Sequence, residues 1–214
     1  MKKPSRTRSE SMRETREALI GAAGREFAEH GLDGPSLDQI CARAGFTRGA
    51  FYVHFRNRED LAAAVMERVY RRFFEVTLGG FPADMDLRAL ILRYGEAISV
   101  GSTAMLGRPS WRFHHTLSAV ARLPKVRARF ISLQREAMEH VSKIASAGQR
   151  AGTVRRDIDP ALLATVISAE ALGLAVMLDT GISFDPRILQ KALVQLFTPP
   201  RPARAGSRQA ARRR

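Results

Sequence analysis

The stretch Ser36-Leu-Asp-Gln-Ile-Cys-Ala-Arg-Ala-Gly-Phe-Thr-Arg-Gly-Ala-Phe-Tyr-Val-His-Phe55 contains the signals of two short helices. It opens on a capping box, because the Ser36 side chain and the Gln39 side chain can each satisfy a backbone N–H at a helix start. This predicts a first helix that ends near residue 44, where Gly45 permits a left-handed turn. Thr47 is placed to cap a second helix over residues 48–54.

Two short helices joined by a three-residue turn that contains glycine predict a helix-turn-helix. Such a unit lays its second helix in the major groove of DNA. Phe51 and Phe55 are four residues apart and are expected on the buried side of that helix. Arg48, Tyr52 and His54 fall elsewhere on its surface, where they are available to DNA.

The residue types on that surface suit a nucleic-acid contact. Arg48 can make a charge-assisted hydrogen bond to a phosphate or a guanine edge, and Tyr52 and His54 carry donors for phosphate oxygens. Val53 can touch a thymine methyl group. Gly49 allows a close approach of the backbone.

Residues Thr15 to Glu67 resemble the DNA-binding domain of the TetR family of bacterial transcriptional regulators. The resemblance rests on the pattern Ala22-Ala23…Phe27…Gly31, on Leu37-Asp-Gln-Ile-Cys-Ala42 with Ala44-Gly45, and on the run Gly49-Ala-Phe-Tyr-Val-His-Phe-Arg-Asn-Arg-Glu-Asp-Leu61. The family often has an aromatic residue where Val53 stands and lysine where Arg56 stands. The DNA-contacting residues predicted from the motif and the resemblance together are Ser36, Thr47, Arg48, Gly49, Tyr52, Val53, His54 and Arg56.

The composition is that of a globular protein that needs no disulfide framework. The chain has 214 residues, of which 45% are hydrophobic and 26% charged, and this length is enough to bury a core. Cys41 is the only cysteine, and we expect it to pack in the core. The first 17 residues are polar and basic without an apolar run behind them, so we expect no cleaved signal peptide and a cytoplasmic location.

Positive charge is concentrated at the two ends of the chain. The formal net charge is +14; residues 1–17 hold six basic and three acidic side chains, and residues 198–214 hold six arginines and no acid. These tails have too few large apolar residues to fold alone. A basic tail suits a polyanion, either nucleic acid or a membrane surface.

Between the tails, apolar residues recur at helical spacing and no stretch alternates long enough to indicate a strand. The sequence therefore predicts an all-α protein of about nine helices. We expect a disordered arm at 1–12, a DNA-binding domain at 13–60 with its motif at 36–55, a regulatory and dimerisation domain at 61–197, and a disordered tail at 198–214. The apolar segment 161–178 contains polar residues and lacks aromatic anchors, so we expect a buried helix rather than a membrane span.

The resemblance implies a homodimer whose C-terminal domain encloses a small-molecule pocket. Independently, apolar residues surround the whole of the predicted helix 160–178, which therefore needs apolar partners on more than one side. The residues expected at the dimer interface are Leu163, Val166, Ile167, Leu174, Leu189 and Leu193. Those expected to line the pocket are Tyr70, Phe74, Tyr94, Met105, Trp111, His114, Phe130 and Met138.

Three other functions have weaker support in the sequence. Ala97-Ile-Ser99-Val-Gly101 differs by one residue from a G-x-S-x-G nucleophile elbow, but Ser99 ends a predicted helix instead of following a strand. His114 and His115 are adjacent and lack a ligand partner at metal-binding spacing, so no metal or cofactor is expected. A basic protein that coats DNA without sequence preference is the remaining alternative. The predicted function is a non-enzymatic, homodimeric repressor released from operator DNA by a small ligand.

Overall fold

The computed structural model describes residues 7–77, 86–99, 113–182 and 185–199. Within these ranges the chain forms nine α-helices and no strand, which confirms the predicted fold class. Their bounds are α1 Arg8–His30, α2 Leu37–Ala44, α3 Arg48–His54, α4 Arg58–Thr77, α5 Leu87–Ser99, α7 Phe113–Arg122, α8 Pro124–Ala151, α9 Pro160–Asp179 and α10 Pro186–Phe197.

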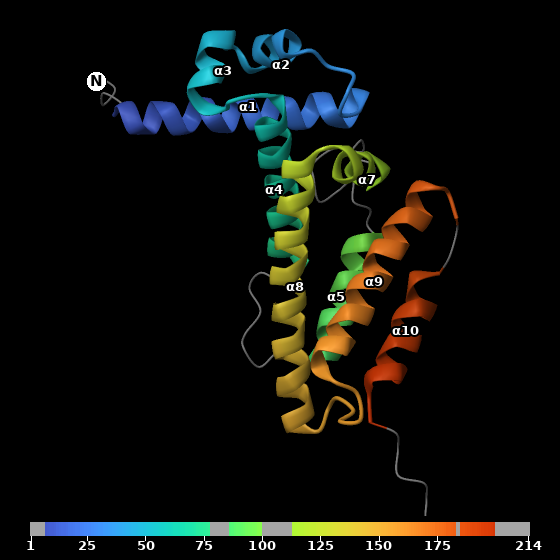
Figure 1. The fold of residues 1–214 in the computed structure, drawn as a ribbon. Coiled ribbons are helices and arrows are strands. Elements are labelled where there is room, and N and C mark those ends of the chain that lie inside the picture. Colours follow the sequence, from blue (N-terminus) through green and yellow to red (C-terminus); the bar gives the residue numbers. More distant parts are fainter. Residues whose placement is uncertain (1–6, 78–85, 100–112, 183–184, 200–214) are drawn as a thin grey trace, which may run out of the picture.

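The helices form two layers (Figure 1). Helices α1, α2 and α3 make one layer, and α4 descends from it beside α8 into a bundle that also contains α5, α9 and α10. Helix α7 lies between the two layers. These three helices, the predicted DNA-binding layer, thus sit at one end of an elongated bundle.

The first helix starts earlier than the sequence analysis predicted. Thr7 and Glu10 form a capping box, in which the Glu10 N–H donates to Thr7 Oγ1 at 3.2 Å and the Thr7 N–H donates to Glu10 Oε2 at 2.9 Å. This cap stabilises the helix start. Residues 8–12, expected to belong to a disordered arm, are therefore helical.

One hydrophobic core joins the DNA-binding layer to the upper part of the bundle. Phe27 of α1 and Phe51 of α3 are fully buried in it, together with Leu61 of α4 and Val126 of α8. The expected domain boundary after residue 60 therefore falls inside one packed core. A movement of α4 or α8 must also shift α1 and α3, because packed cores transmit strain.

A second core fills the lower part of the bundle. It contains Leu87 and Leu90 of α5, Val141 of α8 and Leu163 of α9, with Phe197 of α10. Helix α8 contributes to both cores and so runs the length of the bundle (Figure 1).

Helix α9 is long and apolar enough to cross a membrane by length and composition. Its two ends are nevertheless fixed by polar contacts within the protein. The Asp159 carboxylate accepts hydrogen bonds from the N–H groups of Ala161 and Leu162, and Asp179 contacts His114 of α7. Together with its packing on α8, these contacts make α9 part of the helical bundle.

Candidate nucleic-acid interface

The helix-turn-helix forms where the capping signals predict it. The Ser36 Oγ accepts from the Gln39 N–H at 3.2 Å, and the Ser36 N–H donates to Gln39 Oε1 at 2.6 Å. Gly45 ends α2 with φ of 77°, in the left-handed region that favours glycine. Thr47 Oγ1 then accepts from the Ala50 N–H at 3.3 Å and starts α3.

Helix α3 has one buried side and one exposed side. Phe51 is fully buried and its ring stacks on Phe55 at a centroid distance of 5.5 Å. Tyr52 and Val53 are 53% and 65% exposed and stand next to each other on this side of the helix. The exposed side of α3 is therefore available to a partner.

Most of the predicted DNA-contacting residues lie on this exposed surface. Arg48 lies 3.5 Å from Asp38, a weak contact between two exposed side chains that costs little to break. The pKa of Arg48 is raised, first by its hydrogen bond with Tyr52 and then by Asp38, so Arg48 is a permanent cation here. The residues of the predicted set that are exposed are Ser36, Thr47, Arg48, Gly49, Tyr52, Val53 and Arg56, and His54 is half-buried.

One further cation beside α3 comes from α1 and was not predicted. The guanidinium of Arg16 lies 5.3 Å from the centre of the Phe55 ring, a cation–π distance. Its side chain remains partly exposed. Arg16 and Phe55 are 39 positions apart, so a local reading of the sequence does not show this proximity.

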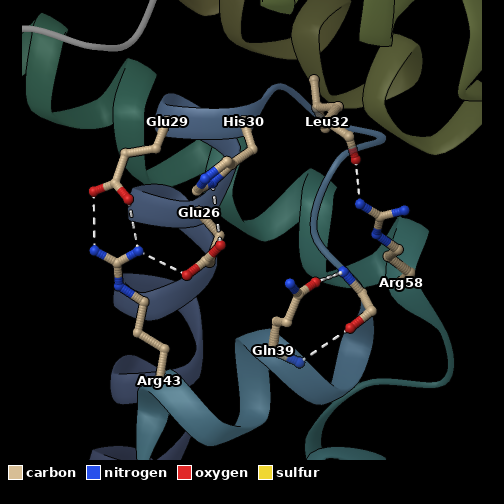
Figure 2. Close-up of polar contacts among 8 residues, drawn as sticks. Glu26, Glu29, His30, Leu32, Gln39, Arg43 and Arg58 are labelled. Carbon is tan, nitrogen blue, oxygen red and sulfur yellow. Dashed lines mark hydrogen bonds and ion pairs between the residues drawn. The ribbon is translucent and has the colours of Figure 1, made fainter.

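A salt-bridge cluster holds α2 against α1 (Figure 2). The two terminal nitrogens of Arg43 contact the two Glu29 oxygens at 2.8 and 2.9 Å, a bidentate arrangement. Arg43 Nη1 also donates to Glu26 Oε1 at 2.6 Å, and His30 Nδ1 lies 3.3 Å from the other Glu26 oxygen. The cluster therefore sets the position of α2, and through the turn that of α3.

Arg58 fixes the loop that leads into α2. It donates to the Leu32 carbonyl oxygen (Figure 2), and its guanidinium lies 5.5 Å from the centre of the Phe27 ring. Burial lowers the pKa of Arg58, which nevertheless keeps its charge at neutral pH because a guanidinium titrates far above it. Neither Arg43 nor Arg58 was assigned a role from sequence, since both contacts depend on how α1, α2 and α4 meet.

The candidate ligand residues separate into three groups. Tyr70 and Phe130 meet edge-to-face at 5.3 Å between α4 and α8, with Phe74 beside them. Met138 packs instead on the lower core. His114 is exposed at the start of α7. Met105 and Trp111 lie outside the described residues, as does the side chain of Tyr94.

The residues predicted for the dimer interface differ in their exposure. Leu163, Ile167 and Leu174 are buried within this chain. Leu189 and Leu193 are half-buried, and Val166 is exposed. The apolar residues that α9 and α10 expose are Leu162, Val166, Val176, Leu178, Ile188 and Leu196.

The DNA-binding layer matches a known family. Residues 19–65 match the model described as "Bacterial regulatory proteins, tetR family". The repressor BepR of Brucella suis is 41% identical over 63 residues, which are 29% of this chain and 30% of BepR. The repressor DhaR of a Mycobacterium species is 26% identical over 163 residues, 74% of this chain and 79% of DhaR. The matched parts cover 30%, 39% and 31% of the lengths of BepR, AcrR and TtgR, so these three similarities are confined to about a third of each relative.

Solved structures share the fold over most of the chain. The reduced form of Escherichia coli NemR superposes with a TM-score of 0.69 at 22% identity, covering 87% of this chain and 98% of NemR. SmeT, the repressor of a Stenotrophomonas maltophilia multidrug efflux pump, has a TM-score of 0.65 at 24% identity and covers 87% of this chain and 93% of its own. At these identities the likeness establishes the arrangement of helices, including that of the bundle.

The capped α2–turn–α3 unit, the exposed side of α3 and the family match all fall in the same residues. Residues 19–65 are therefore similar to the corresponding segment of the bacterial regulatory proteins of the tetR family.

Proposed function

We propose that this protein is a homodimeric, sequence-specific DNA-binding repressor that a small molecule releases from its operator, acting in the cytoplasm. The observation that carries the proposal is the exposed side of α3, where Arg48, Tyr52 and Val53 stand above a fully buried Phe51. A buried anchor fixes the orientation of the helix, and the exposed side chains match the groups that contact phosphates and base edges. The related BepR and DhaR are named transcriptional repressors.

In this proposal the second subunit covers α9 and α10. Leu162 and Val166 are four residues apart on α9, and Ile188 and Leu196 are 69% and 50% exposed on α10. Soluble proteins rarely leave an apolar face of this kind uncovered. A two-fold pairing of these faces would present two copies of α3 to two half-sites of a palindrome.

The ligand site is proposed in the bundle below α1–α3. The aromatic cluster Tyr70, Phe74 and Phe130 lies where α4 passes α8, as part of the core shared with α1 and α3. A ligand there would displace α4, and α4 is packed against α1. The ligand changes operator affinity only if it binds the operator-bound and the released arrangement of the protein with different affinities. SmeT has been solved with triclosan, an aromatic small molecule, which makes triclosan a reasonable first probe.

The test is selection of binding sites from a random duplex library by the purified full-length protein, at two salt concentrations. We expect a palindrome to be enriched at both. Binding that falls with salt but enriches no sequence would refute the proposal and favour a non-specific DNA-coating protein. Dimer formation is checked in parallel by analytical ultracentrifugation. A ligand that dissociates the dimer, instead of lowering operator affinity with the dimer intact, would refute the proposed release mechanism.

A further inference from the structure

Carboxylates from other helices contact the start of α7 and the start of α8, which follows α7 directly. At its start, the His114 N–H donates to Asp179 Oδ2 at 2.7 Å, and His114 Nδ1 lies 3.2 Å from the same oxygen. Beyond its end, in the first turn of α8, the Lys125 N–H donates to Glu59 Oε1 at 2.7 Å. Asp179 belongs to α9 and Glu59 to α4, so α7 and the start of α8 connect the proposed dimer helix to α4, the helix that descends from the DNA-binding layer.

Glu59 supplies a cap that α8 lacks. The residue before α8 is Leu123, whose side chain makes no capping hydrogen bond. The first N–H groups of a helix need an acceptor, and a carboxylate is favoured there by the helix dipole. The only carboxylate shown to accept from the first turn of α8 within the described residues is Glu59, from 66 positions away. This bond therefore stabilises the start of α8 only while α8 stays docked on α4.

Asp179 occupies a position that its own helix disfavours. It is the last residue of α9, where the helix dipole opposes a negative charge. Its side chain is only 12% exposed, so this carboxylate needs hydrogen-bond donors nearby. The first turn of α7 provides them. The unfavourable interaction of the Asp179 carboxylate with the α9 helix dipole is offset only while α7 stays docked on α9.

Charged contacts reinforce the end of α7 nearest the DNA-binding layer. Arg122, the last residue of α7, contacts Asp33 in the loop between α1 and α2, and Lys125 Nζ contacts Asp60. Lys125 is the main cause that lowers the pKa of Asp60. Asp60 also accepts from the N–H of Arg56, just after α3, at 3.2 Å. A displacement of Lys125 and Asp60 therefore also moves the end of α3, the proposed recognition helix.

We infer that Asp179 and Glu59 are positioning residues that make α7 a strut between α9 and the DNA-binding layer, fixing the distance between the two recognition helices of a dimer. The inference rests on the proposed function. While both contacts are present, this strut fixes the distance between the recognition helices. Removing either the Asp179 or the Glu59 contact allows that distance to vary. Operator binding should then lose its dependence on half-site spacing, because a dimer reads half-sites at a fixed separation.

The experiment compares binding of the full-length protein to the selected palindrome and to the same palindrome with its half-sites two base pairs further apart. The ratio of the two affinities is the spacing discrimination. Asp179→Ala and Glu59→Ala should each lower it about three- to ten-fold, in the range that coupling residues alter allosteric linkage. The matched controls Asp179→Asn and Glu59→Gln keep a side-chain oxygen for the cap and should stay within about two-fold of wild type.

The double variant Asp179→Ala/Glu59→Ala tests whether the two ends belong to one strut. If they do, releasing the second end adds little, and the double variant resembles the more affected single variant. Fully additive effects would overturn the single-strut inference. So would alanine variants with wild-type discrimination, or amide variants as impaired as the alanines.

A donor-side variant covers the case in which an alanine variant fails to fold. His114→Pro removes the N–H that donates to Asp179 at a position where the first helical turn tolerates proline. It should lower the spacing discrimination as Asp179→Ala does, with dimer and helical content unchanged, and wild-type discrimination in this variant would overturn the inference. A wild-type protein that selects no palindrome would refute the proposed function itself, and this inference with it, which is a different result from wild-type discrimination in the variants.

Discussion

Helices α3 and α9 both expose large apolar or aromatic side chains, but their surroundings differ. On α3, Tyr52 and Val53 stand beside Arg48 and in a region that also carries Arg16 and Arg56. On α9, Glu170 is the only ionisable residue between Asp159 and Asp179. The first surface suits a polyanion with apolar patches on its base edges, and the second suits another apolar surface.

The difference shows that exposure by itself does not identify a partner. An apolar side chain among cations can add a base contact to a phosphate-binding surface. The same side chain in a stripe without charge needs an apolar cover. Placing one substitution on each surface is therefore the most direct way to test whether the two have different partners.

Val166→Asp on α9 should have the largest effect. The substitution places a carboxylate in the proposed interface twice, once from each subunit, without a cation opposite it. We expect the dimer dissociation constant to rise at least about 100-fold. Sedimentation velocity over a concentration series measures this, and operator affinity should fall with it. A Val166→Asp protein that remains a dimer would show that α9 faces something else.

Val53→Asp on α3 is the matched substitution on the other surface. A carboxylate next to phosphates and base edges should lower operator affinity about 10- to 100-fold through repulsion. The dimer should be unaffected, because α3 takes no part in the proposed interface. Fluorescence anisotropy with labelled operator gives the affinity, and sedimentation the oligomeric state. Loss of the dimer here would contradict the separation of the two surfaces.

Arg48→Ala and Tyr52→Phe sharpen the comparison within α3. Each removes a donor from the proposed DNA surface, and a good contact of this kind contributes about 1–3 kcal/mol. We expect operator affinity to fall about 5- to 50-fold for Arg48→Ala and less for Tyr52→Phe, which keeps the ring. Circular dichroism should show unchanged helical content. Unchanged affinity in both variants would mean that α3 is not the recognition helix.

Glu170→Gln tests the ionisable group in the middle of the apolar helix α9, with the smallest expected effect. Burial raises the pKa of Glu170 to about 7. Its carboxyl is therefore protonated in the folded protein at pH 5 to 6, where the unfolded chain has mostly lost the proton. The folded state binds more protons in this range, so stability falls as the pH rises from about 4.5 to 7 and stays lower above it.

Because Glu170 is only partly buried, solvent screening reduces the penalty to about 1 kcal/mol. Glu170→Gln should remove it, so that the variant is more stable than wild type at pH 8 and similar at pH 4.5. Urea denaturation at both pH values and one protein concentration measures the difference. An equal change at both pH values would point to packing instead of ionisation.

Much of the DNA-binding layer was predictable from the sequence, because its signals are local. The capping residues Ser36 and Thr47 and the stop at Gly45 act within three or four positions of the chain. They gave both ends of α2 and the start of α3 without any knowledge of tertiary contacts. The burial of Phe51 and Phe55 followed from their spacing alone.

The surroundings of that layer were not predictable in the same way. Arg43 finds Glu26 and Glu29, and Lys125 finds Glu59, over separations of 14 to 66 residues. A charged residue in the sequence has many candidates at such distances, and only packing selects one. The sequence alone therefore assigned no role to these charged residues.

Helix α9 marks the limit most clearly. Its composition determined that it would be a helix with apolar residues all around, in need of partners on more than one side. Composition could not say which side meets the chain's own core, because no polar stripe breaks the symmetry. Packing against α8 decided it, burying Leu163, Ile167 and Leu174 and leaving Leu162 and Val166 outside. Local backbone chemistry thus determined the helices and their ends, while long-range packing decided which surfaces remain for a partner.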